Sequence, residues 1–137
     1  MRIGKDLVAA SATPLVLGIL AAGPRHGYAI RKLIAEVSNG RLEWTDGMLY
    51  PLLHRLEAAG QIESAWGRAD NGRRRKVYSI TRLGQAQLAR RREEWNAVAE
   101  TLALVEEGLE RLERLGGGPS WHAGWPTAAQ LSPRGAV

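Results

Sequence analysis

Apolar positions in the first 60 residues follow the spacing of three helices. Residues 5–22 are apolar on nearly all sides between Leu15 and Leu20, which is typical of a buried helix, and Pro14 is suited to open a new helix within them. Residues 26–38 and residues 45–59 each carry apolar side chains at positions i, i+3, i+4 and i+7, which predicts two helices with one buried face. Glycine, alone or after asparagine, follows each segment and predicts where it ends, at Gly23, Asn39, Gly40 and Gly60.

Residues 61–80 show the pattern of a β-hairpin. Residues 61–66 alternate in polarity, and residues 73–80 contain β-branched and aromatic side chains that favour a strand. The loop between them, from Gly67 to Gly72, is rich in turn formers and includes Asn-Gly, which is a strong hairpin signal. We therefore expect two antiparallel strands joined by this loop.

A last helix is expected from a cap at Thr81 to about Leu115. Apolar residues within it are spaced alternately three and four apart, which is the heptad pattern of a helix that pairs with another helix. We call these residues the seam: Trp95, Val98, Leu102, Val105, Leu109 and Leu112. Leu88 extends the seam by one heptad towards the N-terminus, although Arg91 interrupts it. The sequence thus predicts a mainly α fold with a β-hairpin over residues 1–82, a dimerisation helix over residues 83–115 and a disordered tail over residues 116–137.

Charge is distributed unevenly along the chain. Residues 1–92 contain 16 Lys and Arg against 7 Asp and Glu, for a formal charge of +9, whereas residues 93–137 contain 3 against 7, for −4. A basic first part joined to an acidic second part is typical of a domain that binds a polyanion and is followed by a self-associating segment.

Several classes of protein are disfavoured by composition. The absence of cysteine excludes disulfides and thiolate metal sites, and the three histidines lack ligand spacing, so we expect no metal and no cofactor. No apolar run is long enough to cross a membrane, and we expect a cytoplasmic protein. The sequence shows no phosphate-binding glycine loop, no nucleophile elbow and no acid–base pair, so we expect no enzymatic activity.

Three helices followed by a hairpin is the order of a winged helix-turn-helix, whose third helix enters the major groove of double-stranded DNA while the hairpin, or wing, touches the flanking backbone. The leucines of the third helix occupy its inner face, which leaves polar and aromatic residues for DNA. The candidate contacts are Thr45, Met48, Tyr50, His54 and Arg55 in this helix, and Arg68, Arg73, Arg74, Arg75 and Lys76 in the hairpin. The alternative for the hairpin cations is a solvated charge run that protects a sheet edge.

Several motifs resemble the PadR family of transcriptional regulators. They are residues 13–20, His26-Gly27-Tyr28, residues 47–57 with the sequence Gly-Met-Leu-Tyr-Pro-Leu-Leu-His-Arg-Leu-Glu, residues 73–78 with the basic run 73–76, and Ile80-Thr81-Arg82-Leu83-Gly84. The resemblance covers roughly residues 5–105. It implies a homodimer that binds an inverted-repeat operator, usually as a repressor, and that is often released by a small phenolic or hydrophobic effector. It also implies that Tyr28, Tyr50 and the hairpin cations lie at or near DNA, although both tyrosines are equally suited to packing.

Trp95 has two interpretations. The short C-terminal part resembles a branch of the family in which a tryptophan of the last helix stacks on planar drugs, which implies that Trp95 contacts an aromatic effector. Alternatively, Trp95 fills the core of a dimer, as a tryptophan at a heptad position does. A different function for the whole chain, a winged-helix adaptor that binds proteins and not DNA, also stays open at this point, because fold does not fix function.

Overall fold

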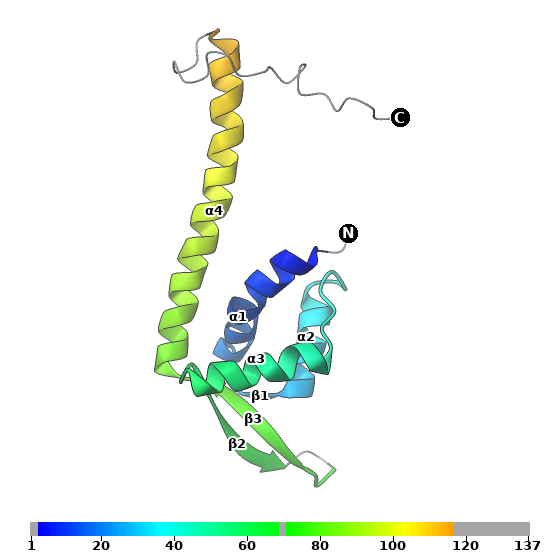
Figure 1. Cartoon of the computed structure of the whole chain (residues 1–137). Helices are drawn as coiled ribbons and strands as arrows, with labels where there is room; N and C mark the ends of the chain where they lie inside the picture. The colour runs from blue at the N-terminus through cyan, green and yellow to red at the C-terminus, as the bar shows by residue number, and fades with distance from the viewer. Residues whose placement is uncertain (1–2, 69–70, 117–137) are drawn as a thin grey trace. The chain divides into compact units, whose positions relative to one another are not determined.

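The computed structural model describes residues 3–68 and 71–116. In chain order its elements are α1 (Lys5–Ala21), β1 (Arg25–His26), α2 (Gly27–Val37), α3 (Asp46–Ala58), β2 (Ile62–Arg68), β3 (Arg74–Ile80) and α4 (Arg82–Arg114) (Figure 1). The chain divides into two compact units, residues 1–95 and residues 96–137, which we call the N-terminal and C-terminal units. The predicted disordered tail lies outside the described residues, apart from Gly116.

The first helix differs from the expectation. We expected Pro14 to begin a new helix, but α1 runs without a break from Lys5 to Ala21 with Pro14 inside it. Proline removes one backbone hydrogen bond from a helix interior. The side chains of Val16, Leu17 and Leu20, which follow Pro14, are buried in the core, and this packing holds the helix together across the missing bond.

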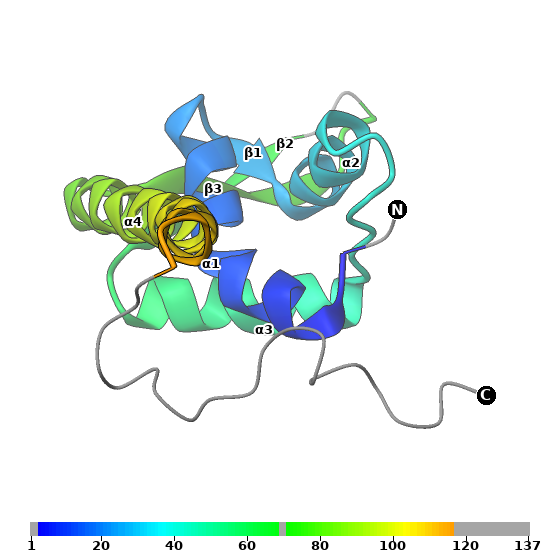
Figure 2. The ribbon, with the colours of Figure 1, turned by 90° about the horizontal axis from the view of Figure 1, so that it is seen from above.

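The helices α2 and α3 begin and end close to the predicted residues. His26 is the N-cap of α2, where its side chain accepts a hydrogen bond from the backbone N–H of Ala29, and Asn39 and Gly40 turn the chain with positive φ after the helix. Thr45 precedes α3 as its N-cap. One hydrophobic core joins these helices to α1 and the sheet. Seen from above, α1 runs between α3 and the sheet (Figure 2). Its buried members are Val16, Leu17, Leu20, Ile30, Ile34, Leu42, Trp44, Leu49, Leu52, Leu53, Leu56, Ile62, Tyr78 and Leu88.

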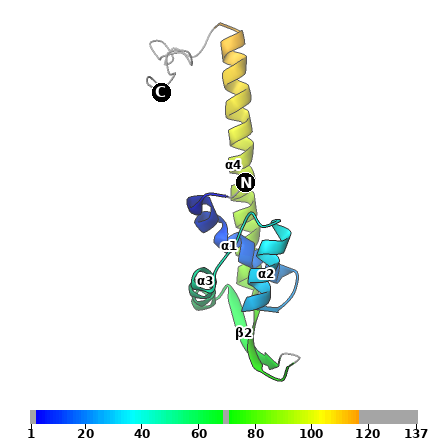
Figure 3. The same cartoon turned by 90° about the vertical axis from the view of Figure 1, so that its right-hand side faces the viewer.

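The predicted hairpin is present, and a third strand that the sequence pattern did not predict pairs with it. The sheet order is β1-β3-β2, with both pairs antiparallel. The two residues of β1 lie opposite Tyr78 and Val77. The far end of the β2–β3 hairpin projects away from α1, α2 and α3 (Figure 3). We call this hairpin, Ile62–Ile80, the wing.

The connection from the wing to α4 is tight. The Thr81 hydroxyl donates to the carbonyl of Gly60 (2.6 Å) and accepts from the backbone N–H of Gly84 (3.1 Å), which caps α4 as predicted. A Cβ atom at Gly84 would lie 2.0 Å from the carbonyl oxygen of Gln61, so only glycine fits where α4 passes this backbone.

The described part of the C-terminal unit is the remainder of α4 followed by residues 115–116. Of its described residues, 96–116, none is buried. Among residues 3–68 and 71–116, no helix combines the length and hydrophobicity that a membrane span requires.

Candidate nucleic-acid interface

The side of α3 that faces away from the core carries the polar and aromatic side chains predicted for it. Leu49, Leu52, Leu53 and Leu56 are buried, whereas the five candidate contacts are exposed: Thr45, Met48, Tyr50, His54 and Arg55. No cap hydrogen bond occupies the side chain of Thr45. This exposed side combines donors, acceptors and a thioether on a regular helix, which suits contact with the base edges of a major groove.

The pairing of β2 with β3 sorts the wing side chains onto two faces. Trp66 lies opposite Lys76, and Arg68 lies opposite Arg74, so these four residues share one face. Arg75 lies opposite Gly67 and projects from the other face. The cations of the wing therefore surround the hairpin instead of forming one stripe, and they offer positive charge to a polyanion on both sides.

Trp66 is a candidate contact that the sequence analysis did not identify. It is 62% exposed, and the guanidinium of Arg74 lies 5.1 Å from its ring centre. A cation at this distance is attracted by the ring. The alternation of β2 was visible in the sequence, but only the strand register shows that an aromatic ring stands among the wing cations.

The base of the wing is tied to α3 by one carboxylate. Glu57 accepts a hydrogen bond from the hydroxyl of Ser64 and lies 3.9 Å from the ammonium of Lys76. Burial raises the pKa of the nearby Tyr78 hydroxyl, and the charge of Glu57 and the neighbouring Tyr50 raise it further. The phenol of Tyr78 therefore stays neutral at physiological pH. These contacts fix the position of the wing relative to α3.

A hollow of about 360 Å³ joins the exposed side of α3 to the wing. It is lined by residues from α2, α3, β1 and β3: His26, Gly27, Tyr28, Tyr50, Arg75, Lys76 and Tyr78. Gly27 lets the Tyr50 ring lie close to the start of α2, because a Cβ at this position would lie 2.7 Å from the Tyr50 hydroxyl oxygen and would displace the ring. The structure thus brings Tyr28, Tyr50, Arg75 and Lys76, which come from separate parts of the predicted list, into one site.

His26 lines this hollow and contacts two of its neighbours. Its Nδ1 is 3.2 Å from the backbone nitrogen of Ala29, and its Nε2 is 3.2 Å from Nη1 of Arg75. The ring of Tyr28 is nearly parallel to the imidazole, with centres 6.3 Å apart. The histidine was predicted only as part of a motif, because its contact with Arg75 joins residues 49 positions apart.

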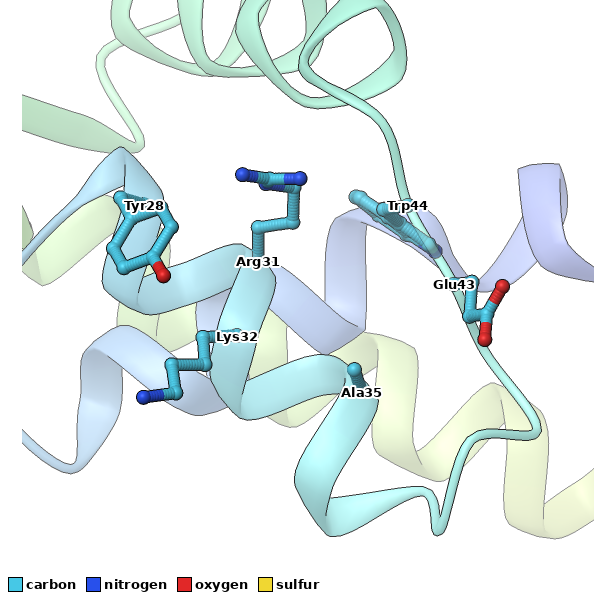
Figure 4. Close-up of a pocket in the computed structure, with 6 residues that line it drawn as sticks. All are labelled: Tyr28, Arg31, Lys32, Ala35, Glu43 and Trp44. Carbon is cyan, nitrogen blue, oxygen red and sulfur yellow. The ribbon is translucent and has the colours of Figure 1, made fainter.

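A second hollow, of about 350 Å³, lies between α2 and the segment before α3. Arg31 extends between Tyr28 and Trp44 in it (Figure 4). Its guanidinium lies 5.4 Å from the ring centre of Tyr28, and its Nε lies 3.2 Å from Asp46. This ion pair offsets the charge of Asp46 at the start of α3, where an unpaired carboxylate would repel phosphate.

Residues 16–90 match the transcriptional regulator PadR-like family. The chain belongs to this family. Uncharacterized protein X of Lysinibacillus sphaericus is 32% identical over 108 residues, which cover 79% of this chain and 99% of that protein. A transcriptional regulator from Clostridium thermocellum has a solved structure with 28% identity and a TM-score of 0.68, covering 74% of this chain and 95% of the other. A PadR family transcriptional regulator from Eggerthella lenta gives 28% identity and a TM-score of 0.66, covering 74% and 87%.

Membership in the PadR-like family gives the general function. The chain is a DNA-binding transcriptional regulator with a winged-helix fold, and it is not an enzyme. The family and the winged-helix fold predicted from the sequence are confirmed. The alternative of a protein adaptor without DNA binding is set aside, because PadR regulators bind DNA.

One predicted site residue needs correction. Leu88, which we expected in the seam, is only 4% exposed and packs in the core of the N-terminal unit. Its side chain is covered by its own chain, so it is not accessible to a second copy. The accessible seam begins at Trp95, which is partly exposed, and continues through Val98, Leu102, Val105, Leu109 and Leu112.

Proposed function

We propose that this PadR-like regulator is a homodimeric repressor of an inverted-repeat operator. In this proposal α3 of each subunit enters the major groove of one half-site, and the wing contacts the flanking phosphates. His54 and Arg55 reach base edges, whereas Arg68, Arg73 and Arg74 fix the register on the backbone without selecting sequence.

The observation that supports DNA contact most strongly is the hollow that joins α3 to the wing. Tyr50 comes from α3, and Arg75 and Lys76 come from β3, yet they line the same space. A single polyanion that follows the exposed side of α3 therefore also meets the wing cations. A solvated charge run that only protected a sheet edge would not need this arrangement.

The proposed dimer rests on the exposed seam of the C-terminal unit. Val98, Leu102, Val105 and Leu109 are between 46% and 63% exposed although they follow a heptad pattern. Burying such a stripe against a second copy of the same helix is the usual way in which heptad leucines and valines are removed from water. A homodimer also matches an operator with two symmetric half-sites, because protein and DNA then share a two-fold axis.

The proposed effector is a flat aromatic compound, and its contact is Trp95 at the start of the seam. An effector alters DNA affinity only if it binds the DNA-competent and incompetent states unequally. The competing role for Trp95 is to fill the dimer core, and the two roles predict different behaviour of a Trp95→Ala variant, as described in the Discussion.

A gel-shift titration against the DNA upstream of the protein's own gene tests the proposed function. We expect binding that exceeds binding to a random duplex of equal length by at least about 10³-fold, as for specific DNA-binding proteins. Half of the operator should bind much more weakly than the full inverted repeat. Equal affinity for the upstream DNA and the random duplex would contradict a site-specific repressor.

A further inference from the structure

A histidine nitrogen and an arginine nitrogen face each other in the hollow that α2, α3 and the wing line. Nε2 of His26 and Nη1 of Arg75 lie 3.2 Å apart. Arginine nitrogens are donors only, so this contact is a hydrogen bond only if Nε2 of the histidine accepts. Whether Nε2 accepts depends on which ring nitrogen carries the imidazole proton, and the hydrogen bond at Nδ1 determines this.

Nδ1 of His26 caps α2 by accepting from the backbone N–H of Ala29. The first amides of a helix have no partner within the helix, and a side-chain acceptor at the N-cap satisfies one of them. An imidazole that accepts at Nδ1 carries its proton on Nε2. With its proton on Nε2, His26 is a donor 3.2 Å from the Arg75 donor, so neither group satisfies the other and each requires an acceptor.

We propose that His26 and Arg75 together form a preformed site for one phosphodiester group of the DNA backbone. This inference rests on the proposed DNA interface and adds His26 to it as a direct contact. A phosphate oxygen accepts hydrogen bonds from both donors at once and compensates the guanidinium charge. Among the residues that the structure describes, no carboxylate forms an ion pair with Arg75.

The surroundings of the site favour an anion of this size. The hollow also presents Tyr28, Tyr50 and Lys76. Lys76 is partly compensated by Glu57 at 3.9 Å, so Arg75 supplies most of the uncompensated charge. Gly27 leaves room for the Tyr50 hydroxyl in its present position, which a Cβ atom there would displace. The His26-Gly27-Tyr28 motif thus combines a helix cap with a phosphate contact.

Two substitutions separate the cap from the phosphate contact. His26→Ser keeps a side-chain acceptor for the helix, since serine is among the best N-caps, but removes the outward N–H. We expect an unchanged melting temperature and a loss of about tenfold in DNA affinity per half-site, as for a hydrogen bond to a charged group. Arg75→Gln should lose at least as much affinity and lower the salt slope by about one per contact. Both losses should be equal on operator and random DNA.

A scan with single methylphosphonates identifies the phosphate group. Each duplex replaces one phosphate of a half-site by a neutral methylphosphonate, and the full-length protein and both variants are titrated against the series. At one position, the methylphosphonate should weaken binding of the unmodified protein. At the same position it should not weaken binding of His26→Ser or Arg75→Gln any further, because these variants already lack the contact. If the effect of Arg75→Gln persists at every position, the anion is not a DNA phosphate and the inference is overturned.

Arg74→Gln is the matched control, because Arg74 lies on the other face of the wing, over Trp66. Its loss of affinity should persist when the phosphate assigned to His26 and Arg75 is neutralised. If Arg74→Gln weakens binding while His26→Ser does not, the interface stands and His26 is only a helix cap. If all three variants bind DNA like the unmodified protein, the proposed DNA interface itself fails.

Discussion

The two units of this chain differ in how far their apolar side chains are buried. In the N-terminal unit, residues from α1, α2, α3, the first part of α4 and the sheet bury one another, so that Leu17, Leu49 and Leu53 are completely covered. In the described part of the C-terminal unit, by contrast, no residue is buried, and Leu102 is 63% exposed. The first unit covers its apolar residues within a single copy, whereas the second leaves an apolar helix face exposed, which the proposed dimer would cover.

This difference implies that the two parts of the proposed function, DNA binding and dimerisation, depend on different kinds of interaction. DNA contact arises from cations and polar side chains held by a packed core, so it should respond to salt. Assembly arises from an apolar helix face, so it should respond to protein concentration and to buried charge. Experiments that change DNA binding without changing dimerisation, or the reverse, test this difference between the units.

The largest expected effect is that of salt on DNA affinity. A dimer that makes roughly 6–10 phosphate contacts should lose about 10³–10⁵ in affinity between 50 and 200 mM salt. Fluorescence anisotropy with a labelled duplex measures this loss. Self-association through the apolar seam should change far less over the same range, and light scattering without DNA provides that control. A flat salt dependence of DNA binding would refute phosphate contact by the wing.

A charge at the centre of the seam should disrupt assembly. Leu102→Lys places an ammonium where two helices would meet, and we expect the dimer dissociation constant to rise by at least about 100-fold, because desolvating a charge costs several kcal/mol. Light scattering over a dilution series measures this change. Glu107→Lys changes charge on the opposite side of the helix in the heptad pattern and should leave the dimer intact. If the Leu102→Lys protein stays dimeric, the seam is not the dimer interface.

When one apolar residue is truncated in each unit, the resulting loss of stability should depend on protein concentration in one unit and not in the other. Leu53→Ala removes a fully buried side chain and should cost about 2–5 kcal/mol of stability. Leu109→Ala should weaken only the dimer, so its effect on unfolding should shrink as the protein is diluted towards the monomer. Urea unfolding at two protein concentrations separates these outcomes. Equal losses from Leu109→Ala at both concentrations would mean that the helix face packs within its own chain.

The loss of affinity caused by a substitution on α3 should depend on the DNA sequence, whereas the loss caused by a substitution on the wing should not. Arg55→Ala or His54→Ala should cost about 1–3 kcal/mol on the operator and should relax base preference, whereas Arg74→Ala should weaken binding to all DNA about equally. Competition between operator and random duplexes measures both effects. If the α3 variants lose the same affinity on both duplexes, then Arg55 and His54 contact only the backbone.

The smallest effect concerns Trp95. If a planar ligand stacks on this ring, it should gain about 0.5–1.5 kcal/mol beyond burial from each ring pair, quench tryptophan fluorescence and weaken operator binding. Trp95→Ala should then abolish the quenching and leave the dimer intact. If Trp95 instead fills the dimer core, the same substitution should cost the dimer about 3–5 kcal/mol, and no planar compound should quench the parent protein.

Local patterns were sufficient to predict most of the fold. The i, i+3, i+4 spacing located α2 and α3 within one or two residues, and the turn loop located the hairpin. Two features depended on tertiary packing and were missed. The strand β1 has only two residues and forms by pairing with β3, and α1 continues through Pro14 because core packing supports it.

The candidate site was predictable as a set of residues but not as an arrangement. Exposure on α3 followed from the leucine pattern, whereas the contacts of His26 with Arg75 and of Arg31 with Asp46 join separate elements and have no local signal. Leu88 shows the opposite error, since its heptad spacing suggested the seam although contacts within its own chain bury it. Periodicity identifies an apolar face without identifying what covers it.

In the proposed regulator, DNA binding belongs to the N-terminal unit and assembly to the seam. The decisive experiment is sedimentation of the full-length protein with a fluorescent operator duplex, in which the unmodified chain is compared with the triple variant Arg73→Ser, Arg74→Ser, Arg75→Ser. These substitutions leave the contact between Lys76 and Glu57 in place. We expect this variant to sediment as a dimer and no longer to sediment with DNA at 100 mM salt. Unchanged DNA binding, or a loss of the dimer together with DNA binding, would refute this division of roles between the two units.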